Sequence, residues 1–183
     1  MFKKKDPNLE RLKNLLSKIE DAESPVGWEK VASPSVGGLT DLGFSKQGPY
    51  LLVISSQGRG LFNCDTGERV SRDYEEYGDW FNDRSLICKG IGPVESELIQ
   101  TCGIHGGGLP HSGVSGESIE VHAPNWPKYD LYFCSEYKSA LIEGHASFCK
   151  KIESEHLRAY GFSWCGNYLV SAIGSDFNLW KKL

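Results

Sequence analysis

The stretch GFSWCGNYLVSAIGSDFNLW, residues 161–180, organises the chain, because a related stretch, GFSKQGPYLLVISSQGRGLF, stands at residues 43–62. Six identical residues fall at the same spacing in the first nine positions of the two stretches, beginning with Gly43, Phe44 and Ser45 of the first copy. An apolar pair closes each stretch, and equivalent positions are 118 residues apart. Self-similarity at a fixed spacing is typical of repeat proteins. We therefore expect two copies of one structural unit.

Each copy predicts a three-stranded antiparallel meander. Residues 168–173 alternate with the period of two that a pleated strand requires. The Gly-Ser-Asp sequence at 174–176 predicts a turn before the last strand, and the first copy runs on into the hairpin signal Asp-Thr-Gly at 65–67. A single meander cannot bury its own face, so the copies must pack on one another.

Two weaker copies fall between the clear ones. Phe81 and Trp126 each precede a polar turn and a hydrophobic run, and the four aromatic residues at 44, 81, 126 and 162 are 37, 45 and 36 positions apart. These separations approach the ~40–45 residues of a propeller blade, and four blades make the smallest propeller. The sequence therefore predicts an all-β fold: a small propeller-like array of about four antiparallel meanders with one N-terminal α-helix. A two-sheet β-sandwich is the alternative.

The clear copies resemble blades of the WD40 family. The shared pattern is Phe-Ser, a glycine turn, Tyr-Leu, a Ser/Gly/Asp turn and an aliphatic residue followed by tryptophan, as at residues 161–180. Trp180 is followed by lysine, so the Trp-Asp ending of that family is absent. The resemblance implies a propeller architecture and no particular chemistry.

A second resemblance rests on glycine-rich and proline-containing segments. The run Gly-Gly-Gly-Leu-Pro at 106–110, Trp126-Pro127 and the Gly-Phe-Ser at 161–163 resemble a group of uncharacterised bacterial proteins. This resemblance implies no activity.

Composition indicates one globular, cytoplasmic domain over residues 1–183, with the β repeats in 27–183. The chain is 39% hydrophobic and carries a formal charge of −4, which suits a single core. No apolar run is long enough to cross a bilayer, and the basic start at residues 1–5 lacks the apolar segment of a signal peptide. The six cysteines are widely scattered, and we expect reduced thiols, as is usual in the cytoplasm.

Residues 6–22 predict the one helix. Asp6 is a good N-cap, Pro7 suits the first helical position, and a leucine stripe follows at helical spacing. We expect this helix to pack on a sheet face, with partner binding as the alternative. Residues 27–32, which contain Trp28, predict a strand that pairs with the last repeat and closes the array.

The segment 65–83 combines acidic and aromatic residues. It holds seven acidic and two basic residues, a balance that argues against a nucleic-acid site, because phosphates require lysine and arginine. Such a run is either a solvated loop or a protein-binding surface, since tyrosine and tryptophan offer large contact areas. The candidate partner-binding anchors are Tyr74, Tyr77, Trp80 and Trp126.

The glycine-rich loop 101–113 supplies a second candidate site. Cys102, His105 and His111 are residue types that ligate metals, although the loop contains no Cys-x-x-Cys pair. The His-Gly-Gly-Gly sequence at 105–108 resembles the oxyanion loop of esterases, but the chain lacks the Gly-x-Ser-x-Gly motif that must accompany it. Phosphate-binding glycine motifs are also absent.

These observations predict a protein that is not an enzyme and uses no cofactor. The expected function is a protein-interaction module, of the kind found in immunity or inhibitor-type proteins, whose partner is another protein and neither nucleic acid nor a membrane. The alternative is a metal- or small-molecule-binding protein that uses the loop 101–113.

Overall fold

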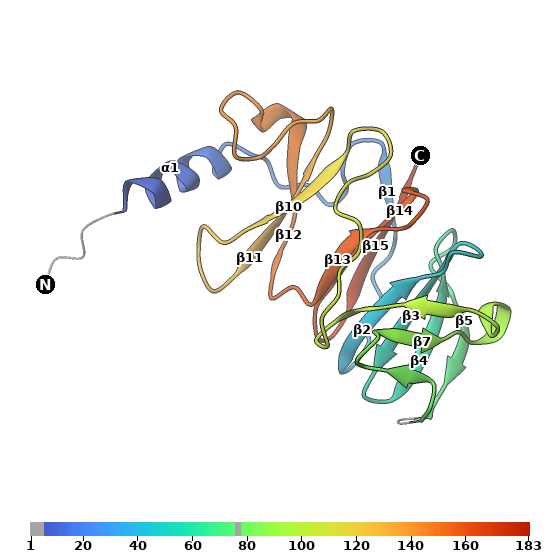
Figure 1. Ribbon diagram of the computed structural model, residues 1–183. Coiled ribbons are helices and arrows are strands. Elements are labelled where there is room, and N and C mark those ends of the chain that lie inside the picture. Colours follow the sequence, from blue (N-terminus) through green and yellow to red (C-terminus); the bar gives the residue numbers. More distant parts are fainter. Residues whose placement is uncertain (1–5, 76–77) are drawn as a thin grey trace, which may run out of the picture. The chain divides into compact units, whose positions relative to one another are not determined.

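The computed structural model describes residues 6–75 and 78–183 (Figure 1). The fold is all-β with a single α-helix, α1 (Pro7–Leu16), and two short 3-10 helices, η1 (Gly92–Val94) and η2 (Ala146–Phe148). The strands are β1 (Trp28–Ala32), β2 (Leu39–Phe44), β3 (Tyr50–Ser55), β4 (Gly58–Asn63), β5 (Arg69–Asp73), β6 (Phe81–Asn82), β7 (Ile87–Lys89), β8 (Leu98–Gln100), β9 (Cys102–Gly103), β10 (Ser118–His122), β11 (Tyr129–Cys134), β12 (Cys149–Glu155), β13 (Ala159–Phe162), β14 (Tyr168–Ala172) and β15 (Phe177–Lys182).

The described strands form four antiparallel sheets. Their orders are β5-β4-β3-β2-β9, β6-β7-β8, β10-β11-β12 and β1-β15-β14-β13. The all-β class with one helix is therefore confirmed. The pairing of β1 with β15, which places Trp28 opposite Lys182, confirms that the segment after the helix joins the last repeat. The propeller-like arrangement of the four sheets stays a prediction.

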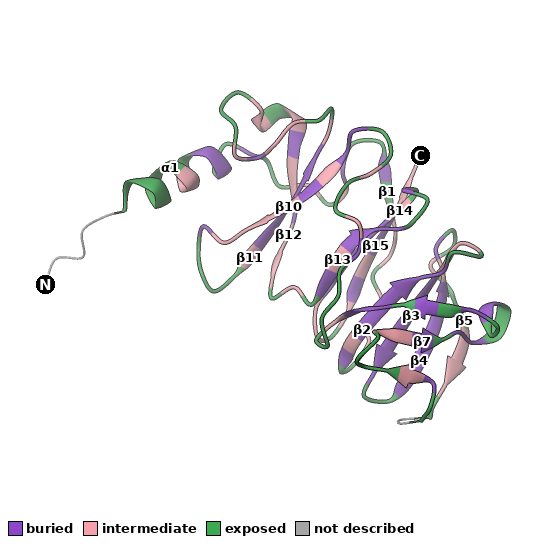
Figure 2. Cartoon of the chain, viewed as in Figure 1, coloured by how far each residue is buried: buried purple, intermediate pink, exposed green. Residues whose placement is uncertain are grey.

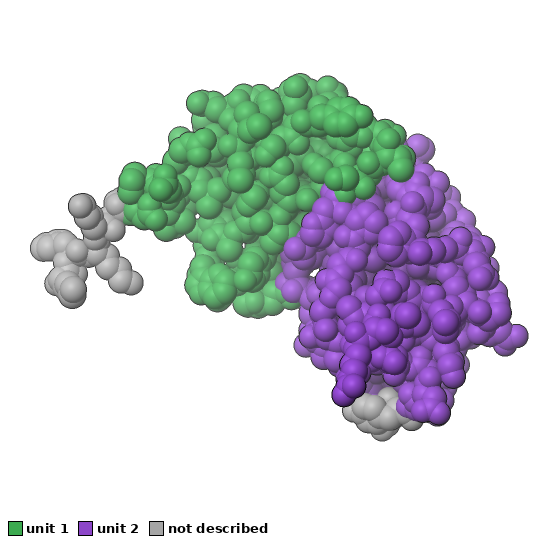
Figure 3. All heavy atoms as spheres, in the orientation of Figure 1, with its two compact units in different colours: residues 1–26, 112–156 green, residues 27–111, 157–183 purple. Residues whose placement is uncertain are grey.

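The chain divides into two compact units (Figure 3). Unit 1 holds residues 1–26 and 112–156, with α1 and the β10-β11-β12 sheet. Unit 2 holds residues 27–111 and 157–183, with the other three sheets. The single domain expected from composition stays a prediction.

The two clear repeats have the same strand pairing in both copies. Phe44 at the end of β2 pairs with Leu51 of β3, and Phe162 at the end of β13 pairs with Leu169 of β14. The serine after each phenylalanine donates its backbone N–H across the turn to a tyrosine carbonyl, over 2.9 Å in the first copy and 2.8 Å in the second. The equivalence of the two copies is confirmed at the level of individual hydrogen bonds.

The glycine before each phenylalanine is required because another segment passes against it. A Cβ atom at Gly43 would lie 2.2 Å from the carbonyl oxygen of Gln100. One at Gly161 would lie 2.3 Å from the Cβ atom of Leu109. Glycine in a strand often marks such a close approach, and here it has the same role in both copies.

The β5-β4-β3-β2-β9 sheet is covered on both faces. On one face, Phe62 meets Phe177 of β15 edge to face, with ring centroids 5.0 Å apart. On the other face, Leu52 and Leu61 pack with Cys88 and other residues of the small β6-β7-β8 sheet and its connections. Strand β3 is consequently buried at nearly every position, not at alternate ones (Figure 2). A strand buried on both faces loses the alternation of polarity that marks a half-exposed strand.

Of the two inner copies, the one at Phe81 has the expected strand pairing and the one at Trp126 does not. Phe81 begins β6 and pairs with Cys88 of β7, seven residues later, the separation that Phe44 and Leu51 have. Trp126, expected to anchor the third copy in the same way, lies instead in the turn between β10 and β11 and is 72% exposed. Strand β10 ends at His122 and β11 begins at Tyr129, so Trp126 belongs to neither strand.

The helix begins as predicted but ends six residues earlier, at Leu16 instead of residue 22. Asp6 caps it, since its carboxylate accepts the backbone N–H of Asn8 at 2.9 Å. Beyond the helix, backbone hydrogen bonds join residues 20 and 22 to Lys151 of β12. Pairing with this strand uses backbone groups that a longer helix would need for itself. The helix end packs on the sheet of unit 1 through Leu16 and its neighbours.

Candidate functional site

A cleft in unit 2 brings together residues from both segments that the sequence singles out. It has a volume of about 460 Å³, within the ~300–1,000 Å³ typical of ligand pockets. Residues from the acidic segment and from the glycine-rich loop face one another across it. This aromatic cleft is lined by Thr40, Ile54, Ser55, Ser56, Gly78, Trp80, Phe81, Asp83, Ile104 and His105.

A short strand pairing positions the glycine-rich loop beside the cleft. Strand β9 pairs with β2, and Gly103 is opposite Asp41. A Cβ atom at Gly103 would lie 2.1 Å from the carbonyl oxygen of Thr40, so only glycine fits this approach. The backbone N–H of Ile104 then donates to that same carbonyl at 3.0 Å. These contacts place Ile104 and His105 at the cleft.

His105 pairs with a buried aspartate. Its Nδ1 lies 2.7 Å from Oδ2 of Asp41, whose side chain is fully buried, whereas the His105 side chain is 37% exposed. The ring of Phe81 meets the imidazole edge to face at 5.3 Å. The aspartate therefore fixes the imidazole against Phe81, and the His105 side chain stays partly exposed.

Two buried polar atoms at this site have no hydrogen-bond partner. Within the described residues, Oδ1 of Asp41 and Nε1 of Trp80 are in this condition. A buried polar group without a partner carries a desolvation cost, and such groups are rare enough in folded proteins to require an explanation. The fold thus keeps two buried polar atoms at this site whose desolvation cost is not offset by a hydrogen bond within the described residues.

Trp80 belongs to the core and is buried, and its role as a partner-binding anchor stays a prediction. It is 6% exposed and packs in the cluster beneath the small sheet. The guanidinium group of Arg59 lies 4.8 Å from the Trp80 ring centroid, and Arg59 also pairs with Asp73 at 2.8 Å. Its sequence neighbours are acidic and exposed, but the chain turns the indole inward.

The other residues predicted in the acidic segment are exposed or undescribed. Tyr74 is 72% exposed, and its ring lies 4.9 Å from the guanidinium carbon of Arg72. Tyr77 lies outside the described residues. Asp79 and Asp83 are exposed on either side of the Trp80-Phe81 pair. The segment therefore combines a buried tryptophan and a half-buried phenylalanine with exposed acidic residues around them.

The three residues predicted to ligate a metal do not converge. His105 faces Asp41, whereas His111 stacks on Tyr160 with ring centroids 5.0 Å apart. Cys102 is buried, and burial, with a smaller effect of the nearby Asp41 charge, raises its pKa to about 12, which disfavours the thiolate that binds metals. No group of three histidine, cysteine or acidic residues in 6–75 and 78–183 could hold a metal ion.

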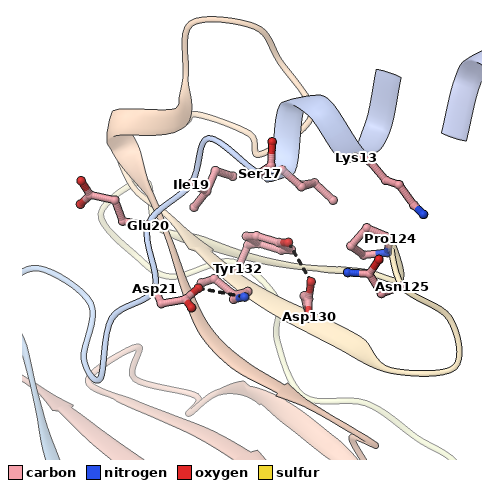
Figure 4. A pocket seen from close by; sticks show the side chains of 11 residues that line it. Lys13, Ser17, Ile19, Glu20, Asp21, Pro124, Asn125, Asp130 and Tyr132 are labelled. Atoms are coloured by element: carbon pink, nitrogen blue, oxygen red, sulfur yellow. Dashed lines mark hydrogen bonds and ion pairs between the residues drawn. The ribbon is translucent and has the colours of Figure 1, made fainter. Parts of the chain in front are cut away.

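Unit 1 has a cavity of its own, between the end of α1 and the sheet (Figure 4). Its volume is about 570 Å³. The buried Asp130 accepts hydrogen bonds from Tyr132 at 3.1 Å and from Ser154 at 2.6 Å, and Lys151 pairs with Asp21 at 2.9 Å. Burial, followed by the Asp130 carboxylate, raises the pKa of Tyr132 above its usual range. These polar groups satisfy one another, so the cavity is a weaker candidate than the aromatic cleft.

Trp126, the remaining predicted anchor, belongs to unit 1. Its ring meets Tyr129 edge to face at 5.6 Å and is otherwise largely exposed. It is therefore available for contact but does not belong to the aromatic cleft.

Sequence reasoning missed Asp41, Ile54 and Ile104. Asp41 lies within an apolar strand sequence, Leu-Thr-Asp-Leu-Gly-Phe, and a carboxylate at the centre of such a run is the one local sign that it has a special partner. The described residues contain no helix long and apolar enough to span a membrane.

No protein-family model, curated protein or solved structure matches this chain.

Proposed function

We propose that the protein is a non-enzymatic interaction module that binds a partner protein at the aromatic cleft. The observation that carries the proposal is the convergence of the acidic segment and the glycine-rich loop on one cleft. In this proposal the partner inserts an apolar side chain into the cleft and places basic residues on the acidic rim.

The apolar character of the cleft supports an inserted side chain. Trp80 and Phe81 form a wall with ring centroids 6.1 Å apart, and Ile104 is 56% exposed at the edge. Interfaces concentrate their binding energy in a few well-packed apolar and aromatic contacts that exclude water. An exposed isoleucine beside an aromatic wall can form such a contact.

The charge of the rim supports a basic partner. Glu75, Asp79 and Asp83 are exposed, and Asp83 also lines the cleft. Complementary charges at the edge of an interface raise the association rate and exclude partners of the wrong sign. A segment with an aliphatic or aromatic residue flanked by lysine or arginine fits both features.

The hydroxyl groups of Ser55 and Thr40, two residues that line the cleft, support binding over catalysis. The Ser55 hydroxyl donates to the backbone carbonyl of Gly58 at 3.2 Å, and the Thr40 hydroxyl donates to that of Ile54 at 3.4 Å. These two hydroxyl groups are thus engaged with backbone. A nucleophilic serine is instead held within hydrogen-bond reach of its base.

A small-molecule ligand is the second candidate, because the volume of about 460 Å³ would hold one. The partly exposed imidazole of His105 would supply its polar contact. A small molecule fills the cleft alone, whereas a protein partner also contacts the acidic rim, and this difference separates the two candidates.

A peptide-library selection tests the proposal. Random peptides are selected on the folded protein, and the recovered sequences are compared with those from an Ile104→Asp variant. We expect peptides with an aromatic or aliphatic residue next to lysine or arginine, and an affinity at least about tenfold lower for the variant, since one lost anchor costs ~1.4 kcal/mol or more.

Val114→Asp is the matched control. Val114 is 68% exposed and belongs to unit 1, so the same chemical change there should leave peptide affinity unchanged. Asp83→Lys tests the rim and should weaken basic peptides only. Peptides that bind Ile104→Asp as well as the parent protein would refute the cleft, and affinity that depends on Ile104 but not on Asp83 would favour the small-molecule candidate.

A further inference from the structure

Two cysteines in unit 1 face each other across adjacent strands. Cys134 of β11 is the register partner of Cys149 of β12, and both are fully buried. Just beyond the pair, the backbone N–H of Ser135 donates to the carbonyl of Phe148 at 3.0 Å. The cysteines therefore occupy a non-hydrogen-bonded pair of the antiparallel ladder.

That position meets the geometric requirement of a disulfide bond. In non-hydrogen-bonded pairs the Cα atoms are ~4.5 Å apart and the side chains are at their closest. Disulfides need Cα separations of ~4.4–6.8 Å. Two cysteines in this register need no strand movement to be joined.

The two thiols belong to an apolar cluster, interact with each other and lie near enough to the Glu120 carboxylate to feel its charge. Leu16, Ile19 and Ala140 belong to the same buried cluster. The hydrogen bond between the thiols raises the pKa of Cys134 and lowers that of Cys149. The thiolate is the reactive form of a cysteine, so this contact favours reaction between the two side chains.

The remaining cysteines lack this arrangement. All six are free thiols, and the other four, Cys64, Cys88, Cys102 and Cys165, belong to unit 2. Of these, Cys64 and Cys165 are near enough for their charges to interact. None of the strand pairings in the described residues places any of these four opposite another cysteine.

We propose that Cys134 and Cys149 are a reversible disulfide site, oxidised by exchange with a small-molecule disulfide such as oxidised glutathione. The thiolate of one cysteine attacks one sulfur of that disulfide, and the first glutathione thiolate leaves. The thiolate of the other cysteine then attacks the protein sulfur of the mixed disulfide, the protein S–S bond forms, and the second glutathione thiolate leaves. Two protein thiols are oxidised, one glutathione disulfide is reduced to two thiols, and the two protons pass to the glutathione.

The bond would close the segment 135–148, which includes η2, into a covalent loop on the β11-β12 hairpin. The strands already pair at this point, so oxidation should preserve the fold. The site thus couples the redox state of the surroundings to the rigidity of this hairpin and its loop.

The test is refolding in a glutathione redox buffer, because refolding gives the reagent access to thiols that are buried in the folded protein. A Cys165→Ser variant is used to remove the exposed thiol. Free thiols are then alkylated and the protein is digested with trypsin without reduction. Cys134 falls in the tryptic peptide 129–138 and Cys149 in 139–150, so a linked pair of these two peptides identifies the bond.

We expect the linked pair to be the main oxidised product and to disappear when Cys134→Ser is added. Its yield should fall as the ratio of reduced to oxidised glutathione rises, and it should re-form when the ratio is reversed. Folded protein in which both peptides are alkylated at every ratio would overturn the proposal. So would a mixture in which Cys134 and Cys149 pair at random with other cysteines.

Discussion

The imidazole of His105 is held by the carboxyl group of Asp41, 64 residues earlier in the chain, with 2.7 Å between Nδ1 and Oδ2. Asp41 is fully buried, and within the described residues its other oxygen has no hydrogen-bond partner. The contact fixes the loop that completes the aromatic cleft. We therefore expect the stability of the site to depend on the contact between His105 and Asp41.

Replacing His105 by alanine should lower the free energy of unfolding by about 1–3 kcal/mol, because it leaves a buried carboxyl group without any partner. Guanidinium denaturation followed by tryptophan fluorescence measures the change. In an Asp41→Leu background the same His105→Ala change should cost less, since no buried carboxyl group remains. An equal cost in both backgrounds would show that the two residues are not coupled.

Phe44→Ala and Phe162→Ala should destabilise the protein to a similar extent, by about 3–5 kcal/mol each, the usual cost of removing a buried phenylalanine ring. The two rings are 2% and 0% exposed and occupy equivalent positions in their sheets. Denaturant midpoints measure both. Tyr74→Ala, at a 72% exposed position, is the control and should stay within about 0.5 kcal/mol. A large cost at one phenylalanine only would mean that the repeats are not equivalent in energy.

Substitution by alanine should lower the stability of the protein much more at Trp80 than at Trp126. Trp80 is 6% exposed and Trp126 is 72% exposed, so Trp80→Ala should cost about 3–5 kcal/mol of stability, and Trp126→Ala less than about 1 kcal/mol. Thermal unfolding by circular dichroism measures the two variants side by side. Comparable melting temperatures for both would contradict the core position of Trp80.

The ion pair of Asp73 with Arg59 should lose its stabilising effect in acid. The backbone N–H of Glu75, followed by the Arg59 guanidinium, holds the pKa of Asp73 below its ordinary value of 3.8. A carboxyl group whose pKa is lower in the folded state stabilises the fold above its unfolded pKa, and this contribution disappears as the pH falls through the folded pKa.

The free-energy difference between the parent protein and Asp73→Asn should therefore be constant from about pH 7 to pH 5 and shrink below about pH 4. Urea denaturation across this range measures it. A difference that grows as the pH falls would have the wrong sign for this ion pair.

Local patterns in the sequence were sufficient for the repeat and for the fold class. The spacing of Phe44, Leu51 and Phe62 recurs at Phe162, Leu169 and Trp180, and each trio lies in register across three strands. Alternation, turn residues and the helix cap at Asp6 are properties of short segments, so short segments reveal them. The pairing of β1 with β15 also follows, because a strand left over at one end of the repeats needs an edge.

Side-chain direction and long-range register required the tertiary structure. Trp80 lies among acidic residues in the sequence but is buried, because the chain turns its side chain under the small sheet. Residues 20 and 22 leave the helix to pair with β12, more than 120 residues away. His105 reaches Asp41 only because β9 adds to β2, a pairing of two short stretches 60 residues apart. The energy of such contacts depends on which distant segments of the chain pack together. A local sequence pattern does not contain this information.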